Sequence, residues 1–382
     1  MSVKRKIAYI TGTRSDFGLM TPVLRAIEQS EKLSLELYAL GTHLMPQFGN
    51  TLELVRGEFP SAQTIDAGVA GSTSAATANF ISDVLAKVTS VFETNRPDLV
   101  LLLGDRPEML AIATACLYLG IPTAHLHGGE RTGTADEVAR HAITKLSSLH
   151  LPATKDAAER IERMGEEASR IHTVGAPALD VILGSALPSR EDVAAFIGIS
   201  VSEKFALLVQ HPSEESSAAG KEMEETLTAL KTIALPIVAV YPNADAGSEK
   251  MIAALEKERG NPLFHIFTNI PYMMFLALER DAAVWVGNSS AACIESASFK
   301  TPVVNIGERQ RGRLCGKNVI NAPHDRTSIA GAVEKALHDK DYRSELPRVS
   351  NPWGDGTAGP RVASILEDLV IDPKLLHKQI SY

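Results

Sequence analysis

The 382-residue sequence lacks any apolar run near the roughly 18 residues that a membrane span requires, which argues against an integral membrane protein. Its three cysteines, Cys116, Cys293 and Cys315, are far apart and form no CxxC pair, so we expect neither a zinc knuckle nor a disulfide framework. Such cysteine usage fits a reducing compartment, and we expect a cytoplasmic protein. The segment MSVKRKIAYI stops at Thr11-Gly12 and is not a signal peptide.

Positive charge is also not in excess. Lys and Arg total 38 against 46 Asp and Glu, and the formal net charge of −8 argues against a nucleic-acid or anionic membrane partner. Local basic pockets for phosphate remain compatible with this balance. The composition, 45% hydrophobic and 22% charged, allows a large core, and the length predicts two domains.

Short apolar runs alternate with longer segments of helical period. In the first half, strands are predicted at 6–10, 35–40, 99–103, 123–126 and 150–152. Helices are predicted between them at 18–29, 82–94, 107–119 and 136–146. The run LVLLL at 99–103 is typical of a parallel strand buried on both faces. These units predict a doubly wound sheet with ligand chemistry at the carboxyl ends of its strands.

The same pattern restarts after residues 174–180. Further strands are predicted at 205–210, 236–242, 263–267, 282–287 and 302–307. We therefore expect a first domain at 1–180, joined by an amphipathic tail at 360–382, and a second domain at 181–359. No linker rich in Gly, Ser or Pro separates them, which favours a hinged pair facing one cleft.

The motif TGTRSDFG follows the first predicted strand. Gly12 permits a tight turn, and a helix N-terminus beside the basic Arg14 would bind phosphate. An ion pair between Arg14 and Asp16 that only stabilises the loop is the alternative. Both stay open, because the motif is neither a Walker loop nor GxGxxG.

A second motif, GDRPE, ends the buried strand at 99–103. Pro107 suits the first position of a helix, and Asp105 would either cap that helix or act in acid–base chemistry. A carboxylate at the carboxyl end of a strand is where α/β enzymes place such groups.

The stretch HLHGGERTGTADEVARHAITK, at 125–145, is dense in titratable groups. His125 and His127 are two apart on a predicted strand and are expected to share a face. Thr134 and Glu137 form a capping box, so a helix should begin there. On that helix Asp136 is four residues before Arg140, and Glu137 is four before His141.

Two functional interpretations of this stretch are open. A metal site would use His125, His127 and Glu130. However, two histidines with one residue between them, followed by two glycines, match no strong ligand motif. An acid–base cluster that includes His127, Glu130 and Asp136 is favoured. We therefore expect no metal ion.

Polar residues also follow the strands of the second half. They are His211, Asn243 and Asp245, Ser289 and Ser290, and the arginines of GERQRGR (307–313), which include Arg309. Ser289 and Ser290 would open a helix that cradles phosphate, with plain capping as the alternative. Glu295, further along, would accept hydrogen bonds from a ribose diol.

These motifs resemble those of the hydrolysing UDP-N-acetylglucosamine 2-epimerases of sialic and legionaminic acid synthesis. TGTRSDFG, GDR, HGGE with D-E-x-x-R-H-A-I-T-K, QHP, YPNADAGS, GNSS and TPVVNIGERQ-x-GR occur in the family's order. Non-hydrolysing relatives usually show GTRPE, GDT and EAGLR instead. The resemblance implies a GT-B fold: two Rossmann-like domains, a central cleft and a C-terminal helix that returns to the first domain.

The resemblance also implies roles for individual residues. Those expected to hold the nucleotide diphosphate are Arg14, Arg106, His211, Asn243, Ser289, Ser290, Glu295 and Arg309. Those expected to act in acid–base chemistry at the sugar are Asp105, Asp136, His127, Glu130 and His211. Two positions depart from relatives: His127 stands where animal bifunctional enzymes carry Glu, and Gly18 replaces a serine.

The implied reaction removes the C2 proton of a UDP-linked N-acetylhexosamine as UDP leaves C1, and water then adds to the 2-acetamidoglycal. No nicotinamide or other cofactor is expected, because the sequence of elimination and addition involves no net redox change. Relatives are commonly dimers or tetramers, so a homo-oligomer is expected. The same reaction on UDP-N,N'-diacetylbacillosamine or a GDP-linked analogue, a GT-B glycosyltransferase, and a non-catalytic sugar-nucleotide sensor are the alternatives.

Overall fold

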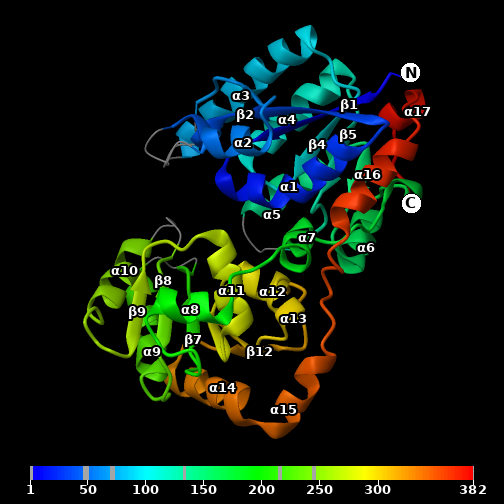
Figure 1. Ribbon diagram of the computed structural model, residues 1–382. Helices are drawn as coiled ribbons and strands as arrows, with labels where there is room; N and C mark the ends of the chain where they lie inside the picture. Colours follow the sequence, from blue (N-terminus) through cyan, green and yellow to red (C-terminus); the bar gives the residue numbers. More distant parts are fainter. Residues whose placement is uncertain are drawn as a thin grey trace. The chain divides into compact units, whose positions relative to one another are not determined.

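The computed structural model describes residues 3–45, 51–68, 74–131, 135–213, 217–242 and 247–381. Its internal contacts divide the chain into two units. Unit 1 comprises Met1–Val181 with Trp353–Tyr382, and unit 2 comprises Ile182–Pro352. Each unit is an α/β structure built on one parallel sheet (Figure 1). Among the helices of the described ranges, none combines the length and apolar character of a bilayer-spanning segment.

The sheet of unit 1 has six parallel strands in the order β3-β2-β1-β4-β5-β6. They are β1 (Arg5–Thr11), β2 (Leu33–Ala39), β3 (Gln63–Thr64), β4 (Leu99–Leu103), β5 (Thr123–Leu126) and β6 (Leu149–Leu151). Every residue of β4 is buried, as its unbroken apolar run predicts. The chain reverses its direction across the sheet between β1 and β4, so their carboxyl ends flank the point where such folds bind ligands.

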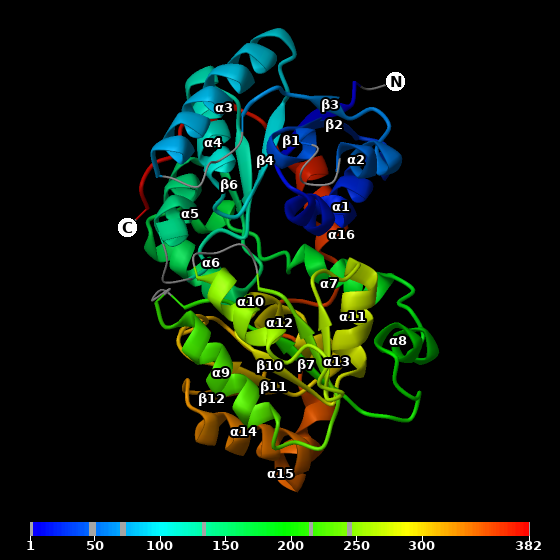
Figure 2. The same cartoon turned by 90° about the vertical axis from the view of Figure 1, so that its left-hand side faces the viewer.

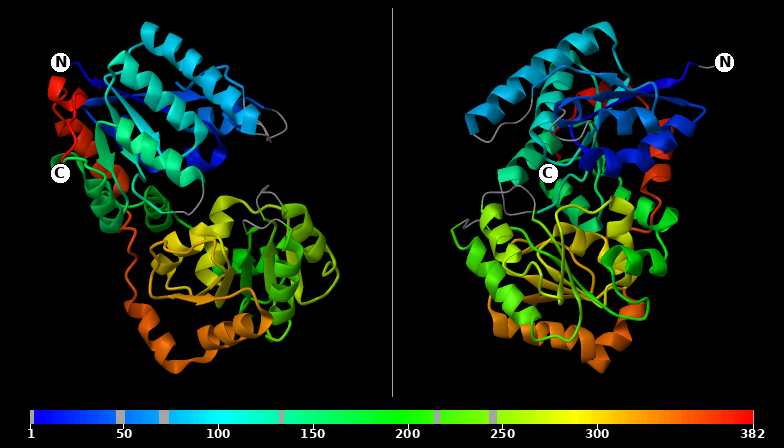
Figure 3. Two further views of the ribbon diagram at one scale, coloured as in Figure 1. Left: turned by 180° about the vertical axis from the view of Figure 1, so that it is seen from behind. Right: turned by 60° about the vertical axis from the view of Figure 1, so that its left-hand side comes forward.

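Helices cover both faces of this sheet. The helices of unit 1 are α1 (Arg14–Gln29), α2 (Leu52–Glu58), α3 (Ser74–Thr94), α4 (Pro107–Leu119), α5 (Ala135–Leu146), α6 (Lys155–Arg163), α16 (Ala358–Asp368) and α17 (Pro373–Leu376), with 3-10 turns η1 (Gly41–Leu44) and η3 (Ala168–Arg170). Helix α7 (Pro177–Gly184) crosses from unit 1 into unit 2. Figures 2 and 3 show α3, α4 and α5 side by side on one face. The C-terminal α16 packs against α1, as the predicted return of the C-terminal helix requires.

Buried charges attach the C-terminal tail to unit 1. The Arg170 guanidinium donates to the Leu375 carbonyl at 2.9 Å. Lys378 Nζ donates to Glu166 Oε2 at 2.7 Å, and Glu166 also accepts from His150 Nε2 at 2.9 Å. Although burial opposes ionisation, these hydrogen bonds lower the pKa of Glu166 to about 2. The tail is therefore an integral part of unit 1.

Helix α1 begins four residues earlier than the predicted residue 18. Thr13 is its N-cap, and Thr13 and Asp16 form a capping box in which Asp16 Oδ1 accepts from Thr13 N at 2.7 Å. This capping role of Asp16 was not recognised from the sequence. Arg14 consequently occupies the first helical position.

Unit 2 repeats the architecture with six parallel strands in the order β12-β11-β10-β7-β8-β9. They are β7 (Ala206–Val209), β8 (Ile237–Val240), β9 (Phe264–Phe267), β10 (Val284–Gly287), β11 (Val303–Ile306) and β12 (Val319–Ala322). Its helices are α8 (Arg190–Ile197), α9 (Ala219–Leu230), α10 (Ser248–Glu256), α11 (Tyr272–Asp281), α12 (Ser290–Ile294), α13 (Ser296–Phe299), α14 (Arg326–His338) and α15 (Lys340–Glu345), with the turn η4 (Leu346–Arg348). The chain reverses between β7 and β10.

Two core clusters lie on opposite faces of the unit 2 sheet. Residues of α9, α10 and α14 pack on one face, and residues of α8, α11 and α12 pack on the other. The strands alternate between the clusters, with Leu208 in the first and Leu207 and Trp285 in the second. Two Rossmann-like units and the returning helix confirm the predicted fold class. The edge strands β3 and β12 were not predicted, because β3 has only two residues and β12 is only partly buried.

Candidate active site

Asp105 and Arg140 meet at the carboxyl edge of the unit 1 sheet. Strands β4 and β5 pair with Leu103 opposite Leu126, so the chain emerges from both strands at the same level. Arg140, on α5, forms an ion pair with Asp105 and donates to the Glu130 carbonyl at 3.0 Å. The proposed capping role of Asp105 is wrong: Arg106 holds the N-cap position of α4, and its side chain makes no capping bond.

Burial raises the pKa of the Asp105 carboxyl above its ordinary value. Arg140 opposes this rise, whereas the nearby carboxylates of Asp136 and Glu130 add to it. Three charged groups therefore act on the Asp105 carboxyl. A carboxyl whose proton affinity is raised in this way is suited to acid–base chemistry near neutral pH.

His127 is held at this edge by Glu130 and by the C-terminal segment. Its backbone has the left-handed φ of 58°, which ends β5 and turns the side chain out of the alternation that His125 follows. The prediction that both histidines share a face is therefore wrong. Nδ1 of His127 lies 2.5 Å from Glu130 Oε1, and its ring stacks on Trp353 with 6.3 Å between ring centroids.

His125 has a structural environment. It is fully buried, and its ring nitrogens contact Thr144 Oγ1 at 3.1 Å and the Gly104 carbonyl at 2.7 Å. Burial lowers its pKa to about 3, so it stays neutral. Both nitrogens are used inside the protein. Across the described ranges, no set of three or more His, Cys, Asp or Glu side chains is arranged to hold a metal ion.

The two predicted phosphate-binding arginines of unit 1 differ in their surroundings. Arg14 is exposed and makes no ion pair with Asp16, whose carboxylate instead accepts from Tyr9, Thr11 and the capping-box backbone. The ion-pair alternative for Arg14 is therefore wrong. Arg106 Nε lies 2.5 Å from Oε1 of the buried Glu108, while its own side chain is 40% exposed. Sequence reasoning missed Glu108, although it stands two residues from Arg106.

In unit 2, Asn288 joins the ends of β7 and β10. Its amide accepts from the His211 backbone N–H at 2.7 Å and donates to the His211 carbonyl at 2.9 Å. Gly287 precedes it with φ of 139°, and a Cβ at Gly287 would lie 1.9 Å from the Val209 carbonyl. The chain can make this turn only with glycine, and the turn fixes where His211 lies.

A cavity of about 270 Å³ opens at this edge of the unit 2 sheet. It is lined by Val209, His211, Val240, Tyr241, Asn269, Ile270, Phe275, Ser289, Ser290, Ala291 and Arg309. Ser289 is the N-cap residue of α12, but its hydroxyl makes no capping bond. Arg309 Nη1 is 3.4 Å from the Asn288 carbonyl, which links it to the turn that carries His211. Hydroxyl, imidazole and guanidinium groups therefore converge on one cavity.

Glu295, between α12 and α13, is 7% exposed. Its charge acts on Glu279 of α11, which has no exposed surface. Burial raises the pKa of Glu295 to about 7 and that of Glu279 well above its ordinary value. Two such carboxyls cannot both ionise at neutral pH, so the pair carries at most one negative charge there. Glu279 was not identified from the sequence.

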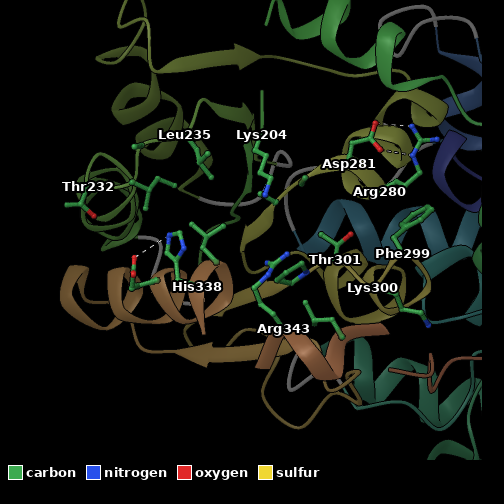
Figure 4. Close-up of a pocket in the computed structure, with 18 residues that line it drawn as sticks. Lys204, Thr232, Leu235, Arg280, Asp281, Phe299, Lys300, Thr301, His338 and Arg343 are labelled. Atoms are coloured by element: carbon green, nitrogen blue, oxygen red, sulfur yellow. Dashed lines mark hydrogen bonds and ion pairs between the residues drawn. The ribbon is translucent and has the colours of Figure 1, made fainter. Parts of the chain in front are cut away.

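A larger cavity, of about 650 Å³, lies at the opposite edge, where the strands of unit 2 begin. Ala283 and Pro302, directly before β10 and β11, line it, and Figure 4 shows the ion pair between Arg280 and Asp281 at its margin. None of the predicted site residues lies there. Volume alone would select this edge, whereas ligand chemistry in such folds occurs at the carboxyl ends of strands.

The predicted site residues thus fall into two groups. The structure brings Asp105, Asp136, His127 and Glu130 together in unit 1, and it brings His211, Ser289, Ser290 and Arg309 together in unit 2. Arg14 and Arg106 begin or precede helices at the ends of β1 and β4, and Glu295 is buried between α12 and α13. Asn243, Asp245 and Thr134 lie outside the described residues. Sequence reasoning did not identify Arg140 and Trp353 as site residues. The sequence signal for Arg140 was its position four residues after Asp136.

Known proteins share the sequence pattern and the fold of this chain. The sequence profile of the UDP-N-acetylglucosamine 2-epimerase family matches residues 25–367. The chain is 36% identical to the hydrolysing UDP-N,N'-diacetylbacillosamine 2-epimerase of Legionella pneumophila, over 99% of this chain and 100% of that protein. It is 33% identical to the UDP-N-acetylglucosamine 2-epimerase of Neisseria meningitidis, over 87% of each chain.

A solved structure shows the same fold. The crystal structure of UDP-GlcNAc 2-epimerase from Neisseria meningitidis, bound to UDP-GlcNAc, aligns with a TM-score of 0.80 at 18% identity. The alignment covers 94% of this chain and 99% of that one. The family profile spans most of the sequence, and relatives above 30% identity cover nearly all of it. The chain belongs to the UDP-N-acetylglucosamine 2-epimerase family.

Proposed function

We propose that this protein is a hydrolysing 2-epimerase that converts UDP-N-acetylglucosamine and water into N-acetylmannosamine and UDP. In the first step a base takes the C2 proton, the C1–O bond to UDP breaks, and a 2-acetamidoglycal remains. In the second step water adds its oxygen to C1, and C2 receives a proton on the opposite face. No electrons are gained or lost overall, so the chemistry needs no redox cofactor.

The observation that carries this proposal is the cluster of Asp105, Arg140, Glu130 and His127 at the carboxyl edge of unit 1. A purely structural ion pair would need only Asp105 and Arg140, so the additional presence of Glu130 and His127 favours acid–base chemistry. We assign the two proton transfers to Asp105 and Asp136, with His127 oriented by Glu130 as a further acid–base group. A well-placed acid or base contributes about 10²–10⁴-fold to a rate.

We assign binding of the departing UDP to the unit 2 cavity. Negative charge develops on the diphosphate as the C1–O bond breaks, and Arg309 with the hydroxyls of Ser289 and Ser290 would stabilise it. Arg14 and Arg106 would add positive charge. Because the start of α12 places Ser289 and the contact with the Asn288 carbonyl places Arg309, these two groups need little reorganisation as charge moves.

Release of a free sugar, rather than a UDP-linked epimer, is proposed from the motifs. The chain has GTRSD and HGGE where non-hydrolysing relatives usually have GTRPE and EAGLR. The 36% identity to a protein described as hydrolysing supports the same assignment. UDP-N,N'-diacetylbacillosamine is the second candidate substrate. The chain is 36% identical to the epimerase described for that sugar and 33% identical to the UDP-N-acetylglucosamine 2-epimerase.

Incubation with each UDP-sugar in deuterated water, without an acceptor, tests the proposal. The expected products are UDP and a free 2-epimer that carries deuterium at C2, and the faster substrate identifies the sugar. A UDP-linked epimer would show that the enzyme is non-hydrolysing. Intact donor that is consumed only when a sugar acceptor is added would indicate a glycosyltransferase. Binding of UDP with no turnover of any donor would indicate a sensor.

A further inference from the structure

Two of the three cysteines meet in the fold of unit 2, although 21 residues separate them in the sequence. Cys293 lies in α12, and Cys315 lies in the loop that follows β11. The two thiols act on each other, and Cys315 Sγ donates a hydrogen bond to the Arg313 carbonyl at 3.5 Å. The third cysteine, Cys116, is buried in α4 of unit 1.

The segments that carry the two thiols are packed directly together. A Cβ placed on Gly316, the residue after Cys315, would lie 2.8 Å from Cβ of Ala297, which is four residues after Cys293. Asn318 Nδ2 donates to Ser296 Oγ at 2.8 Å and so fixes the same two segments. The contact between the thiols is thus set by the surrounding packing and not by a single side chain.

The two thiols differ in their exposure to solvent and in their pKa shifts. Cys293 is fully buried, whereas Cys315 is partly exposed and within reach of a small oxidant. The interaction with Cys293 lowers the pKa of the Cys315 thiol against the opposing effect of burial, and the positive charge of Arg313 lowers it further. Thiolate character and access together determine which cysteine a peroxide oxidises first.

We propose that Cys293 and Cys315 are a site of reversible oxidation to a disulfide by hydrogen peroxide. The Cys315 thiolate attacks the peroxide, the O–O bond breaks, and a sulfenic acid and hydroxide form. The Cys293 sulfur then attacks the sulfenic sulfur, and its proton leaves with the hydroxyl group as water. Overall, two thiols and one peroxide give one disulfide and two waters, and a dithiol reductant reverses the reaction by exchange.

The linkage would join the two segments that line the unit 2 cavity. Cys293 is three residues after Ser290, and Cys315 is six residues after Arg309. Bond formation brings the sulfurs from non-bonded contact to about 2.05 Å. The chain on each side must move, and a displacement of about 1 Å in a binding group can cost up to about 100-fold. We expect oxidation to weaken UDP binding by about tenfold.

Peptide mapping after oxidation tests the site. The full chain is treated with hydrogen peroxide, denatured, alkylated with N-ethylmaleimide and digested without reductant. We expect one cross-linked pair of peptides that contains Cys293 and Cys315, with Cys116 alkylated, and dithiothreitol should restore three alkylated cysteines. In Cys293→Ser the oxidation of Cys315 should stop at the sulfenic acid, which dimedone traps.

Absence of the Cys293–Cys315 cross-link would overturn the proposal, as would oxidation of Cys116 at the same rate. Calorimetric titration with UDP of the reduced and oxidised chains tests the second part, and equal affinities would overturn the coupling to the cavity. Cys315→Ser is the matched control, since its UDP affinity should not respond to peroxide. The cross-link does not depend on the proposed function, so failure of UDP binding in both forms would contradict that function alone.

Discussion

Replacement of Asp105 by asparagine removes one charge from the unit 1 cluster and keeps the shape of the side chain. Asp105 is 25% exposed, and its partner Arg140 is only 5% exposed. The asparagine oxygen can still accept from the Arg140 guanidinium. The substitution therefore isolates the ability of residue 105 to give and take a proton.

The expected loss can be worked out from this geometry. A positioned acid or base contributes about 10²–10⁴-fold, which is about 3–5 kcal/mol of activation free energy, so kcat should fall by that factor. Breaking a buried ion pair costs about 3–5 kcal/mol of folding free energy. Because Asp105 is partly exposed and the amide keeps one hydrogen bond, we expect a loss of about 1–3 kcal/mol. The Kd for UDP should stay unchanged.

Three assays separate these effects: release of UDP followed by a coupled reaction, calorimetric titration with UDP, and urea denaturation. The matched control is Asp98→Asn, an exposed carboxylate before the other end of β4 that accepts from the Lys6 N–H at 2.8 Å. Turnover by Asp105→Asn equal to that of Asp98→Asn would refute a proton-transfer role. Equal losses of turnover and UDP affinity would instead make Asp105 a binding residue.

Three further predictions concern charge. Arg309→Ala should weaken UDP binding by about 1.5–3 kcal/mol, measured by calorimetry, because a charged hydrogen-bond donor is lost; Arg311→Ala, 82% exposed in the same loop, should not. The pKa of Glu166 is about 2, against an ordinary 4.5, so its ionised form should contribute up to about 3 kcal/mol to the free energy of unfolding above pH 4.5. This contribution is lost as the pH falls toward 2. Glu166→Gln should remove that pH dependence, measured by urea denaturation. Glu279, whose pKa is raised, should destabilise the fold as pH rises above its ordinary 4.5, so Glu279→Gln should raise the thermal midpoint more at pH 8.5 than at pH 5. A pH-independent difference would contradict the raised pKa of Glu279.

The core strands followed from the sequence because their signal is local. Strands β4 and β5 begin and end at the predicted residues. The apolar run of β4 is typical of a parallel strand buried on both faces. The edge strand β12 gave no such signal, because only its last residue is buried. Hydrophobic periodicity therefore located the interior strands and the edge strands β6 and β9, and it missed the edge strands β3 and β12.

Site residues were harder to place because their partners are distant in sequence. The positive φ of His127 and its stack on Trp353, 226 residues later, leave no local pattern. Arg140 was noted only for its spacing from Asp136, whereas it pairs with Asp105. The Cys293–Cys315 contact was missed because the widely separated cysteines were taken to be unpaired.

The account as a whole depends on which bond to UDP is broken. UDP-N-acetylglucosamine labelled with ¹⁸O at the oxygen that bridges C1 and the β-phosphorus distinguishes the possibilities by mass spectrometry of the products. Elimination across C1 and C2 predicts that all of the label leaves with UDP. Label in the released sugar would mean that the enzyme cleaves the P–O bond, and the proposed proton chemistry at C2 would be contradicted.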